Sequence, residues 1–199
     1  MTAILLETGK KSTPEYVFLS TLLRYLGLDS VKYEIITVGG KDNLPNVSNK
    51  MRDVELNGGK NVLIFDADTA INGGGFSVRL SEIKATLSSK GVNAEIFLFP
   101  NHQDDGDFET MLDRIANRTS HKLFFDCFSD FECCVSPQYI APNLKGKLHT
   151  YVSSQKWLSK KQRDNIGKGE WLFEEERLWN LGSPELQSLK DFLLCNLRE

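Results

Sequence analysis

The sequence has no long apolar run. None of its apolar stretches approaches the roughly 18 to 20 residues that a transmembrane helix needs. Residues 1–6 are also too short for a signal peptide, because charged and polar residues follow at once. Hydrophobic residues make up 40% of the 199 positions and charged residues 26%, as in ordinary soluble globular proteins. We therefore expect a cytoplasmic protein without a membrane partner.

Cysteine and histidine are scarce. The four cysteines, Cys127, Cys133, Cys134 and Cys195, show none of the repeated spacings of a zinc site. We expect them to be free, buried thiols. The three histidines are scattered along the chain and are interpreted as surface or loop residues. The chemistry of the protein is therefore sought among its carboxylates.

Strand-like and helix-like patterns alternate along the first half of the chain. Residues 3–7, 31–38, 61–68 and 94–99 have the apolar or alternating pattern of strands. The segments between them carry apolar residues at spacings of three and four and end at glycines, as helices do. Four such alternations within about 100 residues predict an α/β fold with a four-stranded, mainly parallel sheet flanked by helices.

The pattern becomes helical after residue 118. A buried aromatic helix face is expected from Leu123, Phe124, Phe125, Phe128 and Phe131. A last helix is expected to open at Ser183 and Pro184 and to present a leucine stripe. We interpret residues 1–118 as an α/β domain and residues 119–199 as a C-terminal helical extension packed on it.

Two acids, Asp66 and Asp68, end the third predicted strand. Alternation along a strand places them on the same face, where two carboxylates repel each other unless a cation or a proton shields them. Such a pair favours Mg²⁺, which prefers hard oxygen ligands, with Mn²⁺ as a possible substitute. Each acid could instead be a helix cap or a turn former.

Other residues should join the two aspartates, because the carboxyl ends of parallel strands meet at one edge of a sheet. Glu7 follows the first strand and is a candidate metal ligand or general acid/base. Glu109 is a further candidate metal ligand, although a helix dipole alone would favour an acid there. Gly9, Lys10 and Gly40 are candidate substrate-binding residues, and Gly9 would let a phosphate approach the backbone.

Three features in chain order are similar to a known family. Glu7 and Gly9 form an acid-and-glycine turn after the first strand, Gly39-Gly40 follow the second strand, and Phe65-Asp-Ala-Asp68 end the third. This order resembles the Toprim fold of primases, topoisomerases and overcoming-lysogenization-defect nucleases. The segment from Phe99 to Leu112 is similar to an uncharacterised Toprim-like branch.

The resemblance implies Mg²⁺-dependent phosphodiester chemistry on nucleic acid or nucleotide, by a nuclease or nucleotidyl transferase. It also implies that Glu7 is an acid/base or metal ligand and that Asp66 and Asp68 are Mg²⁺ ligands. The family turn has glutamate directly followed by glycine, whereas Thr8 intervenes here. That difference motivates an alternative, a non-catalytic metal- or nucleotide-binding regulatory module.

Two further motifs match the sequence less well. Asp66-Ala-Asp68 also resembles the nucleophile strand of haloacid-dehalogenase-like phosphatases, but that motif has threonine where Ala70 stands and opens the chain. A P-loop is disfavoured because Ile4 replaces its first glycine.

The net charge of −3 disfavours a general nucleic-acid coat but leaves room for a local basic patch. Residues 145–168 collect lysines and an arginine near Tyr151, Trp157 and Trp171. Such a cluster is usually a solvated face, but with these aromatics it could guide a nucleic-acid backbone.

Overall fold

The computed structural model of the chain describes residues 1–28 and 30–198. Its centre is a four-stranded parallel sheet with the order β2-β1-β3-β4. The strands are β1 (Thr2–Leu6), β2 (Tyr33–Thr37), β3 (Asn61–Asp66) and β4 (Glu95–Phe99). The predicted α/β class and parallel sheet are confirmed. The third strand is shorter than expected, because it ends at Asp66 and does not include Asp68.

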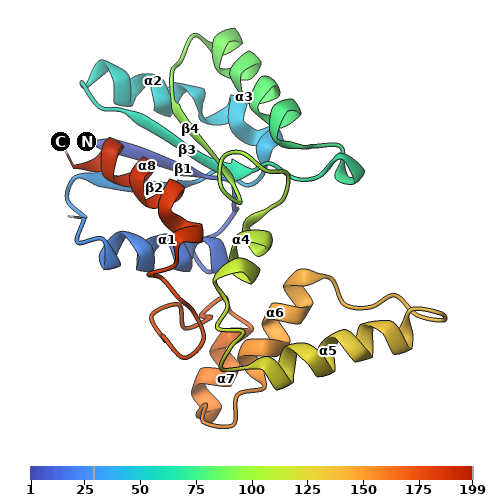
Figure 1. Cartoon of the computed structure of the whole chain (residues 1–199). Helices are drawn as coiled ribbons and strands as arrows, with labels where there is room; N and C mark the ends of the chain where they lie inside the picture. The colour runs from blue at the N-terminus through green and yellow to red at the C-terminus, as the bar shows by residue number, and fades with distance from the viewer. Residues whose placement is uncertain (29, 199) are drawn as a thin grey trace.

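Helices cover both faces of the sheet (Figure 1). One face carries α2 (Ser48–Leu56) and α3 (Phe76–Lys90), and the other carries α1 (Pro14–Tyr25) and α8 (Gln187–Leu197). The helix α4 (Phe108–Ile115) follows β4. Short 3₁₀ turns are η1 (Lys41–Val47), η2 (Ala70–Asn72) and η3 (Pro184–Leu186). Within residues 1–28 and 30–198, none of the helices has both the length and the apolarity that a membrane crossing needs.

Local sequence signals account for the ends of α1 and α4. The hydroxyl of Thr13 accepts a hydrogen bond from the Tyr16 amide, and Pro14 occupies the first helical position. Asp107 caps α4 through the Thr110 amide. The helical segment expected between the second and third strands is split, because Pro45 lies in a 3₁₀ turn that precedes α2.

Alternation along the strands divides the buried residues into two cores. Ile4 and Leu6 of β1 point toward the larger core under α1, α4 and α8, while Leu5 points toward the smaller core under α2 and α3. The same alternation holds along β3 and β4. The sheet is therefore buried on both faces, as parallel sheets are.

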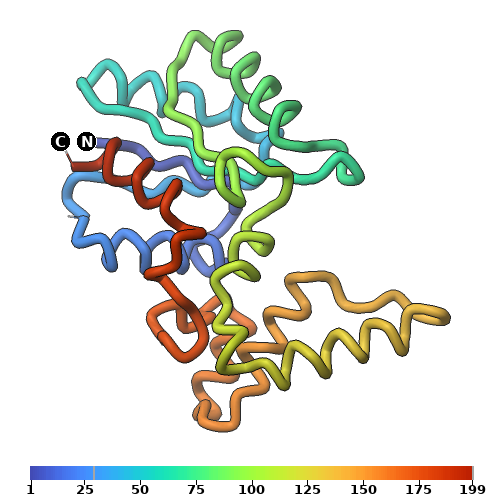
Figure 2. Tube along the Cα trace, viewed as in Figure 1, coloured from blue at the N-terminus to red at the C-terminus, as the bar shows by residue number. Residues whose placement is uncertain are grey.

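The second half of the chain leaves the sheet and then returns to it. The helices α5 (Lys122–Val135), α6 (Leu144–Ser153) and α7 (Lys160–Ile166) lie apart from the sheet, and α5 projects outward (Figure 1, Figure 2). The last helix, α8, lies beside the sheet, where the ring of Phe192 is 5.4 Å from that of Phe97 in β4. The described chain therefore ends close to where it begins.

Two expectations, one about the aromatic face of α5 and one about the four cysteines, need correction. Phe125 and Phe128 are buried, but Leu123 and Phe131 are 77% and 46% exposed, so only part of the predicted aromatic face is core. The four cysteines are free, as expected, but all are exposed rather than buried. The physical reason on α5 is that the helix projects from the body, so neighbouring elements cover one narrow stripe of it.

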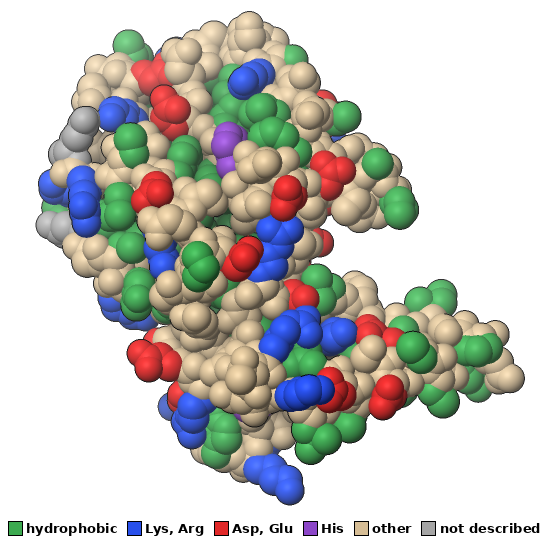
Figure 3. Space-filling model, in the orientation of Figure 1, with side chains coloured by type: hydrophobic (Ala, Val, Ile, Leu, Met, Phe, Trp, Pro, Cys, Tyr) green, Lys and Arg blue, Asp and Glu red, His purple; other side chains and the backbone are tan. Residues whose placement is uncertain are grey.

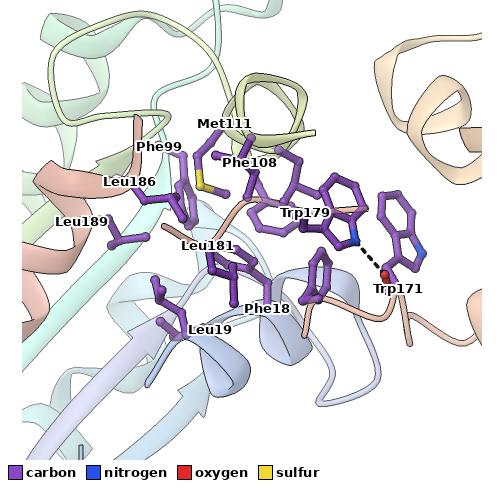
Figure 4. Packing of buried hydrophobic residues seen from close by; sticks show 14 of the residues in the cluster. Phe18, Leu19, Phe99, Phe108, Met111, Trp171, Trp179, Leu181, Leu186 and Leu189 are labelled. Atoms are coloured by element: carbon purple, nitrogen blue, oxygen red, sulfur yellow. Dashed lines mark hydrogen bonds between the residues drawn. The ribbon is translucent and has the colours of Figure 1, made fainter. Parts of the chain in front are cut away.

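Trp179 joins the sheet domain to the helical extension. Its ring is 1% exposed, and its Nε1 donates a hydrogen bond of 2.9 Å to the carbonyl of Trp171 (Figure 4). The ring also packs 5.5 Å from Phe173 and 5.7 Å from Tyr151 of α6. The larger core thus continues from the sheet into the extension.

We expect Trp179→Ala to lower the free energy of unfolding by about 3–5 kcal/mol, because it leaves a large cavity at this junction. Urea unfolding followed by circular dichroism measures the change. Trp157→Ala is the matched control, because Trp157 is only partly buried and should cost less. Equal losses in both variants would contradict the central role of Trp179.

Candidate functional site

Glu7 lies directly after β1, at the carboxyl edge of the sheet. The backbone amides of Asp66 and Lys41 donate hydrogen bonds to its Oε2 and Oε1, at 2.9 and 3.2 Å. Burial raises the pKa of Glu7 above its ordinary value, and the Asp68 carboxylate raises it further. Two fixed donors therefore hold a carboxylate in a place where its charge is disfavoured.

Asp66 ends β3, next to Glu7. The amide of Phe108, at the N-terminus of α4, donates a hydrogen bond of 2.9 Å to its Oδ1. The residue keeps some exposed surface, but its carboxyl group is surrounded by protein. Burial raises the pKa of Asp66 well above 3.8, and the carboxylates of Glu7 and Glu109 raise it further. A small cavity of about 130 Å³ is lined by Glu7, Glu15 and Asp66.

Asp68 does not continue the strand alternation beyond Asp66. Its φ of 59° is left-handed, which redirects its side chain. The carboxylate instead lies 2.5 Å from Nη2 of Arg79, a residue of α3 that is 1% exposed. A side chain on Gly74 would collide with Asp68 Cβ at 2.6 Å, so glycine permits this tight turn. The premise that Asp66 and Asp68 share a strand face is therefore wrong.

Glu109 is held by a lysine from the extension. Its Oε1 lies 2.7 Å from Nζ of Lys145 in α6, and Nζ is also 3.3 Å from Oε1 of Glu15 in α1. Burial raises the pKa of Glu109, while Lys145 acts in the opposite direction. Glu109 thus lies near Asp66, but its nearest cation is an ammonium group of the chain itself.

These carboxylates form a row along the carboxyl edge of the sheet, which we call the acidic row. Its members are Asp68, Glu7, Asp66, Glu109 and Glu15. Arg79 pairs with Asp68 at one end, and Lys145 pairs with Glu109 and Glu15 at the other. The centre of the row, Glu7 and Asp66, has no basic side chain in an ion pair among the described residues.

Sequence reasoning missed three members of this arrangement. Glu15 reads as an ordinary acid in the first turn of a helix. Arg79 lies in α3, where its burial could not be anticipated. Lys145 was grouped with the basic segment, and no sequence signal places it beside Glu109.

The structure also brings the candidate substrate-binding residues to this edge. The amides of Gly39 and Gly40 donate hydrogen bonds to the backbone carbonyl of Glu7, at 2.9 and 2.7 Å. A Cβ on Gly9 would lie 3.5 Å from Gly39 Cα, so the two loops touch. Lys10 is exposed beside them.

The basic segment at residues 145–168 offers no stacking platform for nucleic acid. Tyr151 and Trp171 are 0% and 2% exposed. The ring of Trp157 is covered by the Arg177 guanidinium, 3.8 Å from its centroid. Arg163 donates hydrogen bonds to three backbone carbonyls, so it is structural. Lys145 and Lys147 form ion pairs with acids of the chain. The other lysines of the segment, Lys156, Lys160, Lys161 and Lys168, are exposed to solvent.

The carboxylates of the acidic row fit Mg²⁺ only in part. In residues 1–28 and 30–198, no group of three or more histidine, cysteine, aspartate or glutamate side chains is arranged to hold a metal ion. Mg²⁺ is, however, commonly held by one or two carboxylates, with waters and substrate phosphates as its other ligands. Glu7 and Asp66 fit that smaller role, because both line the same small cavity, and neither forms an ion pair with a basic side chain among the described residues. Asp68 and Glu109 are held by Arg79 and Lys145 instead.

Comparisons of the chain with family models, curated proteins and solved structures give no match.

Asp66→Asn should stabilise the metal-free protein at pH 7. The asparagine oxygen can still accept the Phe108 amide, while the disfavoured buried charge is removed. Thermal unfolding measures the change, with about 2–4 °C expected for each kcal/mol gained. Asp53→Asn, at an exposed position on α2, should leave the midpoint unchanged.

The pH dependence of this difference has a definite sign. Below pH 3.8 Asp66 is protonated in both states, so wild type and variant should differ little. As the pH rises, unfolded Asp66 loses its proton first, and wild-type stability falls relative to Asp66→Asn until the raised pKa of the folded state is passed. A gap that narrows with rising pH would contradict the raised pKa.

Proposed function

We propose that the protein is a Toprim-type, Mg²⁺-dependent enzyme that acts on phosphodiester bonds of nucleic acid, as a nuclease or nucleotidyl transferase. One observation carries the proposal: Glu7 and Asp66 lie side by side, partly buried, at the carboxyl edge of a parallel sheet, and the Glu7 carboxylate adds to the rise that burial causes in the pKa of Asp66. Buried like charges of this kind require a proton or a cation.

The chain supplies a rigid setting for the pair. The amides of Lys41 and Asp66 orient the Glu7 carboxylate, and the Phe108 amide orients Asp66. When bound, Mg²⁺ would neutralise charge that develops on a phosphate and orient the attacking oxygen. The raised pKa of Glu7 also suits it to hold or release a proton nearer neutral pH than an ordinary glutamate.

Nucleic acid is favoured as substrate by the loop between β1 and α1. Lys10 and Lys11 are exposed in this loop, beside the turn that holds Glu7. Two lysines next to an acidic centre suit a phosphate backbone, which needs positive charge around its reacting group.

A non-catalytic metal- or nucleotide-binding module is the second candidate. The ion pair between Asp68 and buried Arg79 favours it, because that pair withdraws one of the three carboxylates that the family resemblance assigns to Mg²⁺. A haloacid-dehalogenase-like phosphatase is less favoured, since its nucleophilic aspartate must be ionised, whereas burial raises the pKa of Asp66.

The decisive experiment measures cleavage of single- and double-stranded DNA and RNA, and nucleotidyl transfer, with Mg²⁺ or Mn²⁺. We expect metal-dependent turnover that falls at least about 100-fold in Glu7→Gln and in Asp66→Asn. Glu95→Gln is the control, because Glu95 begins β4 at the opposite edge of the sheet and should retain activity.

Calorimetry with MnCl₂ separates the two candidates. Binding that both substitutions abolish, without turnover on any substrate, favours the non-catalytic module. Turnover that survives both substitutions overturns the proposed site.

A further inference from the structure

Lys145 is the contact between the helical extension and the acidic row. It lies in the first turn of α6, and its Nζ is 2.7 Å from Glu109 Oε1 and 3.3 Å from Glu15 Oε1. The two acids belong to α4 and α1, which border the sheet. One ammonium group thus bridges two carboxylates from different elements.

The two carboxylates have little other compensation. Glu109 is 8% exposed, and its Oε1 accepts no aligned hydrogen bond despite the short ionic contact with Lys145. Oε2 of Glu15 is also buried without a hydrogen-bond donor. Neither acid has a second basic partner among the described residues. Buried carboxylate oxygens in this state are strongly disfavoured unless a cation is near.

The position of these oxygens relates them to the proposed site. Glu15 lines the same 130 Å³ cavity as Glu7 and Asp66, and the charge of Glu109 reaches Asp66. The Lys145 side chain is 50% exposed, so its ammonium can leave the acids for solvent without opening the core. The Lys145 ammonium and a free cation would therefore compete for the same carboxylates, Glu15 and Glu109, beside the cavity.

We propose that Lys145 is a tethered counter-ion, which keeps a divalent cation away from the Glu15 and Glu109 half of the acidic row. The extension thereby sets the cation affinity of the site. This inference rests on the proposed function, because the contact of Lys145 would regulate the same proposed cation site at Glu7 and Asp66.

A consequence for the extension follows from linkage. A divalent cation that binds near Glu15 and Glu109 displaces the ammonium and weakens the hold of α6 on α4, and docking of α6 weakens cation binding by the same factor. Figure 3 shows the molecular surface hollowed between the sheet domain and the projecting arm that α5 and α6 form.

The test compares Mn²⁺ binding by calorimetry to the full-length wild type and three variants. Lys145→Met removes the charge and keeps the side-chain length, and we expect at least about tenfold tighter binding, since a unit charge a few ångströms from the cation is lost. Lys145→Arg keeps the charge and should bind like wild type. Lys147 lies on the same helix as Lys145, and Lys147→Met, which breaks an ion pair with Glu132 of α5, should also bind like wild type.

A fourth variant locates the effect. Adding Glu109→Gln to Lys145→Met should abolish the gain in affinity, because it removes a carboxylate that the cation would use. Circular dichroism checks that each variant is folded. If Lys145→Met does not fold, Lys145→Arg still tests the proposal, because it keeps the positive charge: tighter Mn²⁺ binding by Lys145→Arg than by wild type would overturn the proposal.

The outcomes separate this inference from the proposed function. Tighter binding by Lys145→Met supports the tethered counter-ion, even where wild type binds no Mn²⁺. Wild-type binding that requires Glu7 and Asp66, with no gain in Lys145→Met, overturns the counter-ion alone. Absence of binding by every variant overturns both.

Discussion

This structure depends on one constraint: the negative charge of partly buried carboxylates at the sheet edge must be compensated. A parallel sheet sends the carboxyl ends of all its strands to one edge, and here that edge gathers Glu7, Asp66 and their neighbours. Water cannot fully solvate these groups, so the protein supplies backbone amides at the centre and basic side chains at the ends. The two ends are neutralised by the chain, whereas the centre is left for a proton or a cation.

The rest of the fold holds this edge in place. The α1 and α4 helices present their N-termini toward the acidic edge, and their apolar faces are fixed by the larger core (Figure 4). That core runs through Trp179 into the extension, so α6, which carries Lys145, is held by apolar packing as well as by charge. The same helix, α6, therefore contributes both to the core and to the charge balance of the acidic row. A change in the extension can thus alter the electrostatics of the sheet edge.

The fold was largely predictable from the sequence, and the details of the site were not. Apolar runs and glycine-ended helices are local signals, so they gave the parallel sheet, and the connections then placed Glu7 and Asp66 at one edge. The alternation argument failed at Asp68, because the chain turns there through a left-handed residue that no local pattern announces. The pairing of Glu109 with Lys145 depends on residues 36 positions apart in different elements, and only tertiary packing brings them together. Exposure of the cysteines on α5 likewise depends on where that helix lies.

Because α8 returns to the sheet, the helical extension is an internal segment of the fold and not a C-terminal appendage. Residues of α5, α6 and α7 enter after α4 and leave before α8, so they form an insert within the α/β unit (Figure 1). Shortening the chain from its end would strip a helix from the sheet before it reached the insert. An engineer who wished to remove the extension would have to excise it from within and rejoin α4 to α8, and evolution could vary its length or sequence in the same way without disturbing the sheet.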